Sequence, residues 1–211
     1  MDSRTQASAW PNLVSIGLRN ELRPPLDNVL LTAESYNWLS WYTNMRLGAD
    51  TVTAANPNIL IFMGGINSDT TLYPIPTGSS LASGINFDLN NFPYKTKLVL
   101  ELHNYDTSAT PTIACFLLEA ELYIDGFNAL DTSNPSVKNV MPVVMTEFGY
   151  AQDESDVNGV YASCLRSYLP SQQAGWMVWD IAGSYYIRQG VQDSDETYGK
   201  TLNNGKMDDS G

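Results

Sequence analysis

The sequence predicts an α/β fold built on a parallel sheet, and three observations lead to this prediction. Five short apolar runs are spaced along the chain, segments of helical character lie between them, and chemically useful polar residues follow the runs at their carboxyl ends. Continuous rather than alternating apolar runs suit strands that are covered on both faces. Strands that alternate with helices call for right-handed crossovers, in a doubly wound sheet or in a barrel.

The five apolar runs are the candidate strands. They are "LVSIGL" (13–18), "ILIFM" (59–63), "KLVLEL" (97–102), "PVVMTE" (142–147) and "GWMVWDI" (175–181).

Three segments between these runs are candidate helices, over 34–56, 110–127 and 154–170. In the first, aromatic and apolar residues recur at three- and four-residue spacing, and Asn56-Pro57 supplies a stop. The second begins with Thr110 before a proline and ends at Gly126. The third ends at Pro170. Strands and helices are therefore predicted to alternate along most of the chain.

Two segments break this rhythm. The segment 64–96 is rich in glycine, proline, serine and asparagine, and it is expected to form a long loop, with at most a short helix. Long loops in α/β proteins tend to carry function. The polar, glycine-rich end of the chain, 201–211, is expected to be a frayed, disordered tail. The whole chain, 1–211, is predicted to form a single domain.

Composition narrows the class of partner. The chain has 211 residues and a net charge of -12, so nucleic acid and anionic membrane surfaces would repel it. The sequence has no run long enough to span a bilayer and no apolar segment at its start like that of a signal peptide. Aromatic residues make up 11% of the chain, with 5 Trp and 12 Tyr, which suits a core but also the apolar faces of sugar rings.

The chain has 2 cysteines, Cys115 and Cys164, too few for a disulfide scaffold or a zinc cluster. They fall in two separate helix-like segments. One inter-helix disulfide and two buried free thiols are both compatible with this placement.

Ionisable and aromatic residues collect at the carboxyl ends of the predicted strands. Asn20 and Glu21 follow the first run, His103 and Tyr105 the third, Glu147 ends the fourth, and Trp179 lies late on the fifth. This edge is where ligands bind in parallel α/β folds and where barrels hold their active sites. Two carboxylates, a histidine and aromatic residues on one rim favour glycoside hydrolysis, in which one carboxylic acid protonates the leaving oxygen while the other attacks the anomeric carbon or activates water.

Other chemistries have less support. With His103 as the only histidine, a His-rich metal site is excluded and a Ser-His-Asp triad has one candidate base, with no G-x-S-x-G motif beside it. No nucleotide-binding motif is present. We therefore expect no metal and no cofactor.

Each candidate also has an ordinary structural interpretation. Glu21 alone is more often a surface or capping residue, Glu147 could pair with an arginine, and His103 alone is more often a satisfied structural imidazole. Trp176 and Trp179 are three apart on a strand and point to opposite faces, so at most one lines a cleft and the other is expected in the core. Only their joint placement favours catalysis.

Four motifs, in this order, resemble family 5 of the glycoside hydrolases, the cellulase family, and most of all its fungal secreted members. They are "LRNELR", "ELHNYD", "VVMTEFGY" and "GWMVWDIAGSYYIRQGVQDSDETYG". The resemblance covers nearly all of residues 10–200 and implies a (β/α)8 TIM barrel, of which this chain holds strands four to eight. It also implies a retaining enzyme that acts on β-linked glucans or mannans, outside the cell and as a monomer.

The resemblance implies a role for each strand-end residue. Glu21 is the expected acid/base and Glu147 the expected nucleophile, with their carboxyl groups roughly 5–5.5 Å apart. Substrate contacts are expected from Asn20 to the 2-hydroxyl and from His103 and Tyr105, the latter close to the nucleophile. Trp179 is the expected sugar platform.

The chain also departs from the family pattern. If the run 13–18 is the fourth strand, the first three strands, with the family's early arginine and histidine, have no counterpart, whereas such a barrel needs about 250 residues. The chain is thus expected to be a truncated retaining glycosidase, in the first place an endo-β-1,4-glucanase of cellulose or glucan breakdown. The alternative is a catalytically inactive relative that at most binds sugar weakly.

Overall fold

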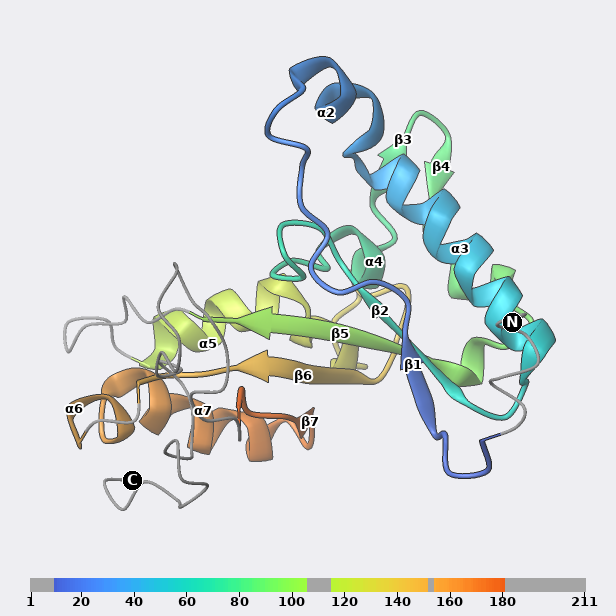
Figure 1. The fold of residues 1–211 in the computed structure, drawn as a ribbon. Helices are drawn as coiled ribbons and strands as arrows, with labels where there is room; N and C mark the ends of the chain where they lie inside the picture. Colours follow the sequence, from blue (N-terminus) through green and yellow to red (C-terminus); the bar gives the residue numbers. More distant parts are fainter. Residues whose placement is uncertain (1–9, 106–114, 152–153, 181–211) are drawn as a thin grey trace. The chain divides into compact units, whose positions relative to one another are not determined.

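The structure is a computed structural model that describes residues 10–105, 115–151 and 154–180 (Figure 1). The chain forms two compact units, and each is described by itself. Unit 1 comprises residues 1–102 and 123–144, and unit 2 comprises residues 103–122 and 145–211. The predicted tail 201–211 and the predicted helix start at Thr110 lie outside the described residues.

The sheet of unit 1 is parallel, as predicted. Strand β1 (Ser15–Gly17) pairs in parallel with β2 (Leu60–Gly64), and β2 pairs in parallel with β5 (Leu98–Asn104). The next strand, β6 (Val143–Phe148), joins β5 at its start, where the Leu100 N–H donates to the Pro142 carbonyl at 2.9 Å. Every residue of β5 is buried, which explains the three consecutive apolar residues at its start, Leu98–Leu100.

The order of the strands distinguishes a barrel from a doubly wound sheet. The five-stranded sheet has the order β1-β2-β5-β6-β7, so each strand lies beside the next one along the chain, apart from the separate pair β3-β4. A doubly wound sheet reverses its order at a switch point, whereas a barrel adds its strands in sequence. The observed order is that of a barrel segment.

The predicted helix 34–56 forms as two helices, α2 (Val29–Ser35) and α3 (Trp38–Ala55). The break falls at Asn37, whose side-chain oxygen accepts the Ser40 N–H at 2.9 Å and caps α3. Helix α3 then buries Trp41, Met45 and Ala49, one residue per turn. The prediction of one continuous helix was wrong because this capping residue lies inside it, but the predicted end at Asn56 is confirmed.

The segment 64–96 contains more structure than predicted. It forms the short helix α4 (Pro74–Thr77), the antiparallel strands β3 (Ser80–Ala82) and β4 (Ile85–Asn86), and two 3-10 turns, η1 (Leu89–Asn91) and η2 (Lys95–Lys97). Asn139, which is 3% exposed, accepts from the Leu89 N–H and donates to the carbonyls of Ile75 and Phe87. This segment is therefore a packed part of unit 1. The expected short helix is present as α4, but the hairpin β3-β4 was not predicted, because strands this short leave no periodic pattern.

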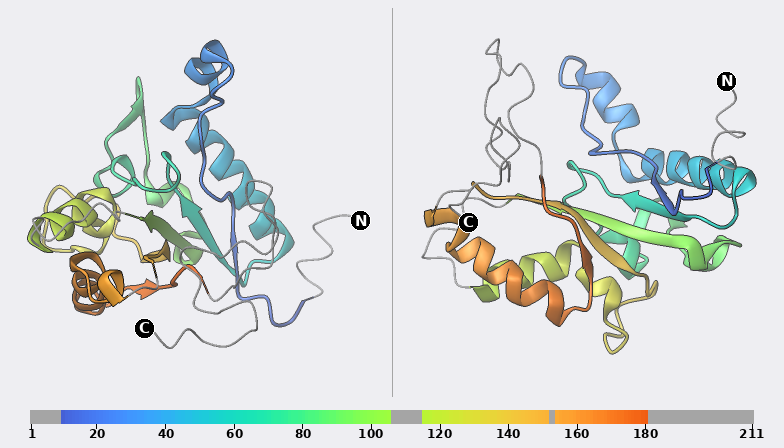
Figure 2. Two further views of the ribbon diagram at one scale, coloured as in Figure 1. Left: turned by 60° about the vertical axis from the view of Figure 1, so that its left-hand side comes forward. Right: turned by 60° about the horizontal axis from the view of Figure 1, so that its bottom comes forward.

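Unit 2 contains the carboxyl ends of β5 and β6 together with β7 (Gly175–Trp176), α6 (Glu154–Val157) and α7 (Val160–Ser171). Strand β7 continues the sheet, because Met177 and Trp179 donate backbone hydrogen bonds to the carbonyls of Met145 and Phe148 at 2.9 and 2.8 Å. Helix α7 lies beside β7 (Figures 1 and 2). Strand β7 is much shorter than the predicted run 175–181.

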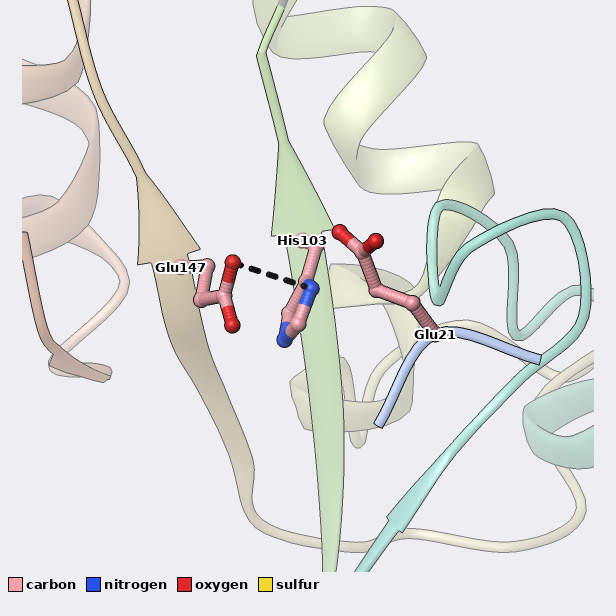
Figure 3. Close-up of side chains that lie close together, drawn as sticks. All are labelled: Glu21, His103 and Glu147. Atoms are coloured by element: carbon pink, nitrogen blue, oxygen red, sulfur yellow. Dashed lines mark ion pairs between the residues drawn. The ribbon is translucent and has the colours of Figure 1, made fainter. Parts of the chain in front are cut away.

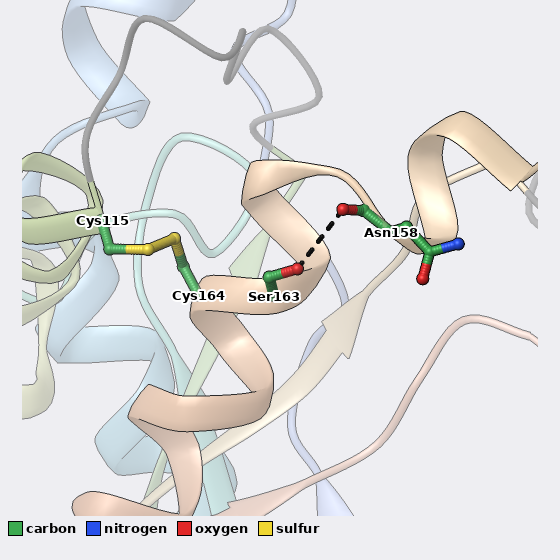
Figure 4. The surroundings of a disulfide bond; sticks show 4 residues. All are labelled: Cys115, Asn158, Ser163 and Cys164. Carbon is green, nitrogen blue, oxygen red and sulfur yellow. Dashed lines mark hydrogen bonds between the residues drawn. A yellow bond between two sulfur atoms is a disulfide. The ribbon is translucent and has the colours of Figure 1, made fainter.

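A disulfide joins two helices within unit 2, which decides between the two alternatives left by the sequence. Cys115, the first residue of α5 (Cys115–Asp125), bonds to Cys164 of α7, with their Cα atoms 5.4 Å apart (Figure 4). Helix α5 continues into unit 1, where the 3-10 turn η3 (Phe127–Leu130) follows. None of the described helices is both long and apolar enough to cross a membrane.

Candidate active site

The strand-end residues lie where the sequence predicts them. Glu21 lies on the segment that follows β1. His103 is the second-to-last residue of β5, and Glu147 is the second-to-last residue of β6 (Figure 3). Tyr105 directly follows β5, and Trp179 follows β7. The predicted placement at the carboxyl ends of strands is therefore confirmed for all five residues.

Three of these residues lie together in unit 2, where Tyr105 and His103 approach the carboxylate of Glu147. The Tyr105 hydroxyl donates a hydrogen bond of 2.8 Å to Oε2 of Glu147, and Nδ1 of His103 lies 3.6 Å from the same oxygen (Figure 3). The side chain of His103 is 2% exposed and that of Glu147 is 18% exposed. Glu147 is thus oriented by two neighbours while part of its side chain stays exposed.

A fourth residue supports this cluster and was missed by the sequence analysis. Tyr161, on the first turn of α7, is 4% exposed, and its hydroxyl donates to the carbonyl of Asn104 at 2.6 Å. Asn104 is the residue between His103 and Tyr105, so this hydrogen bond fixes the backbone from which both side chains extend. The only sequence signal was an aromatic residue on the buried face of a predicted helix.

Glu21 occupies a tight turn within unit 1. Its φ angle is 45°, a left-handed conformation that a glutamate rarely adopts, and its backbone N–H donates to Oδ2 of Asp69 at 2.6 Å. Its carboxylate pairs with the Arg23 guanidinium, whose side chain is 70% exposed, whereas the Glu21 side chain is 16% exposed. Asn20, beside it, is exposed. The turn therefore presents an asparagine amide and a glutamate carboxylate side by side.

The exposure of two tryptophans, Trp176 within β7 and Trp179 after it, differs from expectation. Neither is in the core, since Trp176 is 55% exposed and Trp179 is 43% exposed. Trp176 packs edge-on against Phe148, with ring centroids 6.1 Å apart, and lines an apolar cavity of about 330 Å³ with Leu165 and Leu169 of α7. The predicted core position was wrong because β7 is the last strand of the sheet. Trp176 therefore lies against α7, whereas Trp179 follows β7 with a partly exposed side chain.

Glu21 and Glu147 belong to different units, so the expected separation of their carboxyl groups stays a prediction, as do the roles of the site residues.

A family model and a curated relative both match this chain, and both carry the name of the same family. Residues 9–184 match the family described as Cellulase (glycosyl hydrolase family 5). A "Glycosyl hydrolase 5 family protein" of Chamaecyparis obtusa is 31% identical over 198 residues, which are 90% of this chain and 32% of that protein.

Solved structures share the fold. A β-glucanase from Saccharophagus degradans in complex with cellotetraose has a TM-score of 0.57 and 18% identity, over 89% of this chain and 52% of that chain. The catalytic domain of the major endoglucanase from Xanthomonas campestris pv. campestris has a TM-score of 0.56 and 19% identity, over 96% of this chain and 56% of that chain.

This chain spans about a third of the length of the curated relative and about half of each solved chain. The structural likeness, together with the order of the parallel strands, confirms the predicted class, part of a (β/α)8 barrel. The specific resemblance to fungal members stays a prediction. Because the family match covers most of the chain, the chain belongs to family 5 of the glycoside hydrolases, the cellulase family.

Proposed function

We propose that this protein is a retaining glycoside hydrolase that cleaves internal bonds of β-1,4-linked glucan. The observation that carries the proposal is the carboxylate of Glu147, which lies at the end of a barrel strand and is held by Tyr105 and His103 while 18% of its side chain is exposed. Membership of the cellulase family supports the reaction class, and the solved relatives described as a β-glucanase and an endoglucanase support the substrate class.

In the first proposed step, an oxygen of the Glu147 carboxylate attacks the anomeric carbon of a glucosyl unit. The bond from that carbon to the leaving oxygen breaks, and the Glu21 carboxylic acid donates its proton to this oxygen. The Tyr105 hydroxyl holds Oε2 of Glu147, which restricts the carboxylate to one orientation for the attack.

In the second proposed step, Glu21, now a carboxylate, takes a proton from a water molecule, whose oxygen attacks the anomeric carbon. The bond to Glu147 breaks, so both glutamates return to their starting protonation states. Asn20 would bind the sugar 2-hydroxyl from its exposed position beside Glu21. Trp179 would stack on an apolar sugar face, which its exposed fraction of 43% permits.

We also propose that the protein acts outside the cell. Its single disulfide, between Cys115 and Cys164, is typical of oxidising compartments. A net charge of -12 on the protein is compatible with a neutral polysaccharide as substrate, because such a polymer carries no negative charge that the protein would repel.

A second candidate function is sugar binding without turnover. It is favoured by the exposed indole of Trp179, since stacking on sugar rings requires no catalytic pair. The two functions separate in one experiment, in which soluble β-glucan and cello-oligosaccharides are incubated with the protein and with Glu147→Gln. Hydrolysis that disappears in the variant, and that first releases the β-anomer, supports the proposed enzyme. Saturable binding by both proteins without hydrolysis supports the second function.

A further inference from the structure

We propose that Asp69 is a positioning residue for Glu21. Its buried carboxylate accepts the backbone N–H of Glu21 and thereby holds the turn from which the acid/base side chain extends. The inference rests on the proposed role of Glu21, but the contact itself lies entirely within unit 1.

The contact joins two segments that are far apart in the sequence. Asp69 follows β2 and is 0% exposed, whereas Glu21 follows β1, and the hydrogen bond between them spans 48 residues at a donor–acceptor distance of 2.6 Å. Burial excludes water as a competing donor, so this bond is well suited to hold a backbone conformation.

The backbone that is held would otherwise be unfavourable. Glu21 has a φ of 45°, and a residue with a side chain rarely adopts such a conformation unless its surroundings impose it. The left-handed φ aims the Glu21 side chain differently from an extended or helical backbone. Without Asp69, the turn is free to relax and to carry the carboxyl group away from its working position.

Three further hydrogen bonds connect the same two segments, one of them directly and two through the hydroxyl of Tyr36. The Ser68 N–H donates to the Leu22 carbonyl at 3.0 Å, and the Tyr36 hydroxyl donates to that same carbonyl at 2.9 Å. The Asn67 N–H donates to the Tyr36 hydroxyl oxygen at 2.6 Å. The residue after Glu21 and the two residues before Asp69 are thus held together, and Tyr36 links them through one oxygen atom.

The segment after β2 is shaped to deliver the Asp69 carboxylate. Asn67, Ser68 and Asp69 have successive φ angles of 55°, 57° and 59°, which turn the chain sharply back. A Cβ atom on Gly64 would lie 2.3 Å from Oδ1 of Asp69, so only glycine leaves room for this carboxyl group.

The test combines a kinetic measurement with one that does not depend on activity. Asp69→Ala removes the acceptor, Asp69→Asn keeps an acceptor oxygen, and Tyr36→Phe removes the linking hydroxyl. The matched controls are Asp131→Asn and Tyr94→Phe. In the wild-type protein the Asp131 carboxylate accepts from the hydroxyls of Ser133 and Tyr123, and the Tyr94 hydroxyl donates to Asp50.

The kinetic measurement compares aryl cellobiosides with poor and good leaving groups. A dinitrophenolate leaves without a proton, whereas a phenolate needs the acid. We expect Asp69→Ala to lower kcat/KM for phenyl cellobioside by at least about 10-fold and for dinitrophenyl cellobioside by less than about 3-fold. Tyr36→Phe should act in the same direction, and Asp69→Asn should restore much of the loss. Equal losses on both substrates would overturn the proposal.

The second measurement is hydrogen exchange and the ¹H chemical shift of the Glu21 backbone amide. We expect protection in the wild-type protein and in both controls, loss of protection in Asp69→Ala, and its recovery in Asp69→Asn. An unprotected wild-type amide, or one that Asp69→Ala leaves unchanged, overturns the proposal even if Asp69→Ala is active. A protected amide in a wild-type protein that hydrolyses neither substrate supports the contact and instead overturns the proposed function.

Discussion

The Tyr105 hydroxyl donates a 2.8 Å hydrogen bond to the same oxygen of Glu147 that faces Nδ1 of His103. Tyr105 and His103 come from one strand end and Glu147 from the next, so the sheet itself sets their spacing. Orientation of a carboxylate by two neighbours is what an attacking group requires, since an attack depends on the alignment of the reacting atoms.

Removal of the Tyr105 hydroxyl should slow the reaction without weakening substrate binding. A hydrogen bond to a charged group contributes about 1.5–3 kcal/mol, so Tyr105→Phe should lower kcat by about 10- to 100-fold and leave KM nearly unchanged. Steady-state kinetics on cello-oligosaccharides measure both constants. Tyr94→Phe, which removes a hydroxyl bonded to Asp50 instead, should behave as the wild type. A variant of Tyr105 with unaltered kcat would contradict the role given to this contact.

Reduction of the disulfide should destabilise the protein substantially. The bond closes a loop with a sequence separation of 49 residues, for which restriction of the unfolded chain corresponds to about 4 kcal/mol. Thermal unfolding with and without reductant measures the difference. The double variant Cys115→Ser, Cys164→Ser should unfold at the lower temperature in both conditions. Equal melting temperatures for the oxidised and reduced wild type would show that the link contributes little.

Asp131 should make stability depend on pH at the acid end. Its side-chain contact with Ser133 and then the Tyr123 hydroxyl lower the pKa of the Asp131 carboxyl from 3.8 to about 2. Because this pKa is lowered on folding, the stabilisation is complete above the ordinary pKa of an aspartate and disappears as the pH falls to about 2. Asp131→Asn should therefore melt below the wild type near neutral pH and together with it at the acid end. A gap that persists unchanged across this range would be inconsistent with the assignment.

Gly64→Ala should disturb the turn that carries Asp69. The new Cβ atom would meet Oδ1 of Asp69 at 2.3 Å, a clash that costs about 1–3 kcal/mol and is relieved by displacement of the carboxylate. Gly17→Ala is the matched control, because its Cβ would meet the nearest oxygens of Glu101 at 3.7 Å, an ordinary contact. Chemical denaturation of both variants measures the costs. Equal stability of the two would argue against close packing at Gly64.

Much of the fold could be predicted from the sequence because strand and helix positions follow from local patterns. The fully buried β5 is an example, since apolar residues predominate in its first five positions without alternating. The hairpin β3-β4 was missed because its strands have three and two residues. The break before α3 was missed because Asn37 is a capping residue within an otherwise helical pattern.

The strand-end residues were identified from the sequence because they directly follow apolar runs. Their supports were not, since each acts through long-range contacts. Asp69 reaches Glu21 across 48 residues, and Tyr161 reaches Asn104 across 57 residues. No local pattern distinguishes such an aspartate from a solvated loop residue or such a tyrosine from a core residue. Only the folded chain reveals the contacts.

The central claim is that Glu147 is the nucleophile of a retaining glycosidase. Its most direct test is mass spectrometry of the protein after incubation with a 2-deoxy-2-fluoro glucoside or cellobioside that carries a good leaving group. We expect one added glycosyl unit, located by proteolysis on the peptide that contains Glu147, and none on Glu147→Gln. A folded wild-type protein that gains no label and hydrolyses no β-glucan, or that is labelled at another residue, would contradict it.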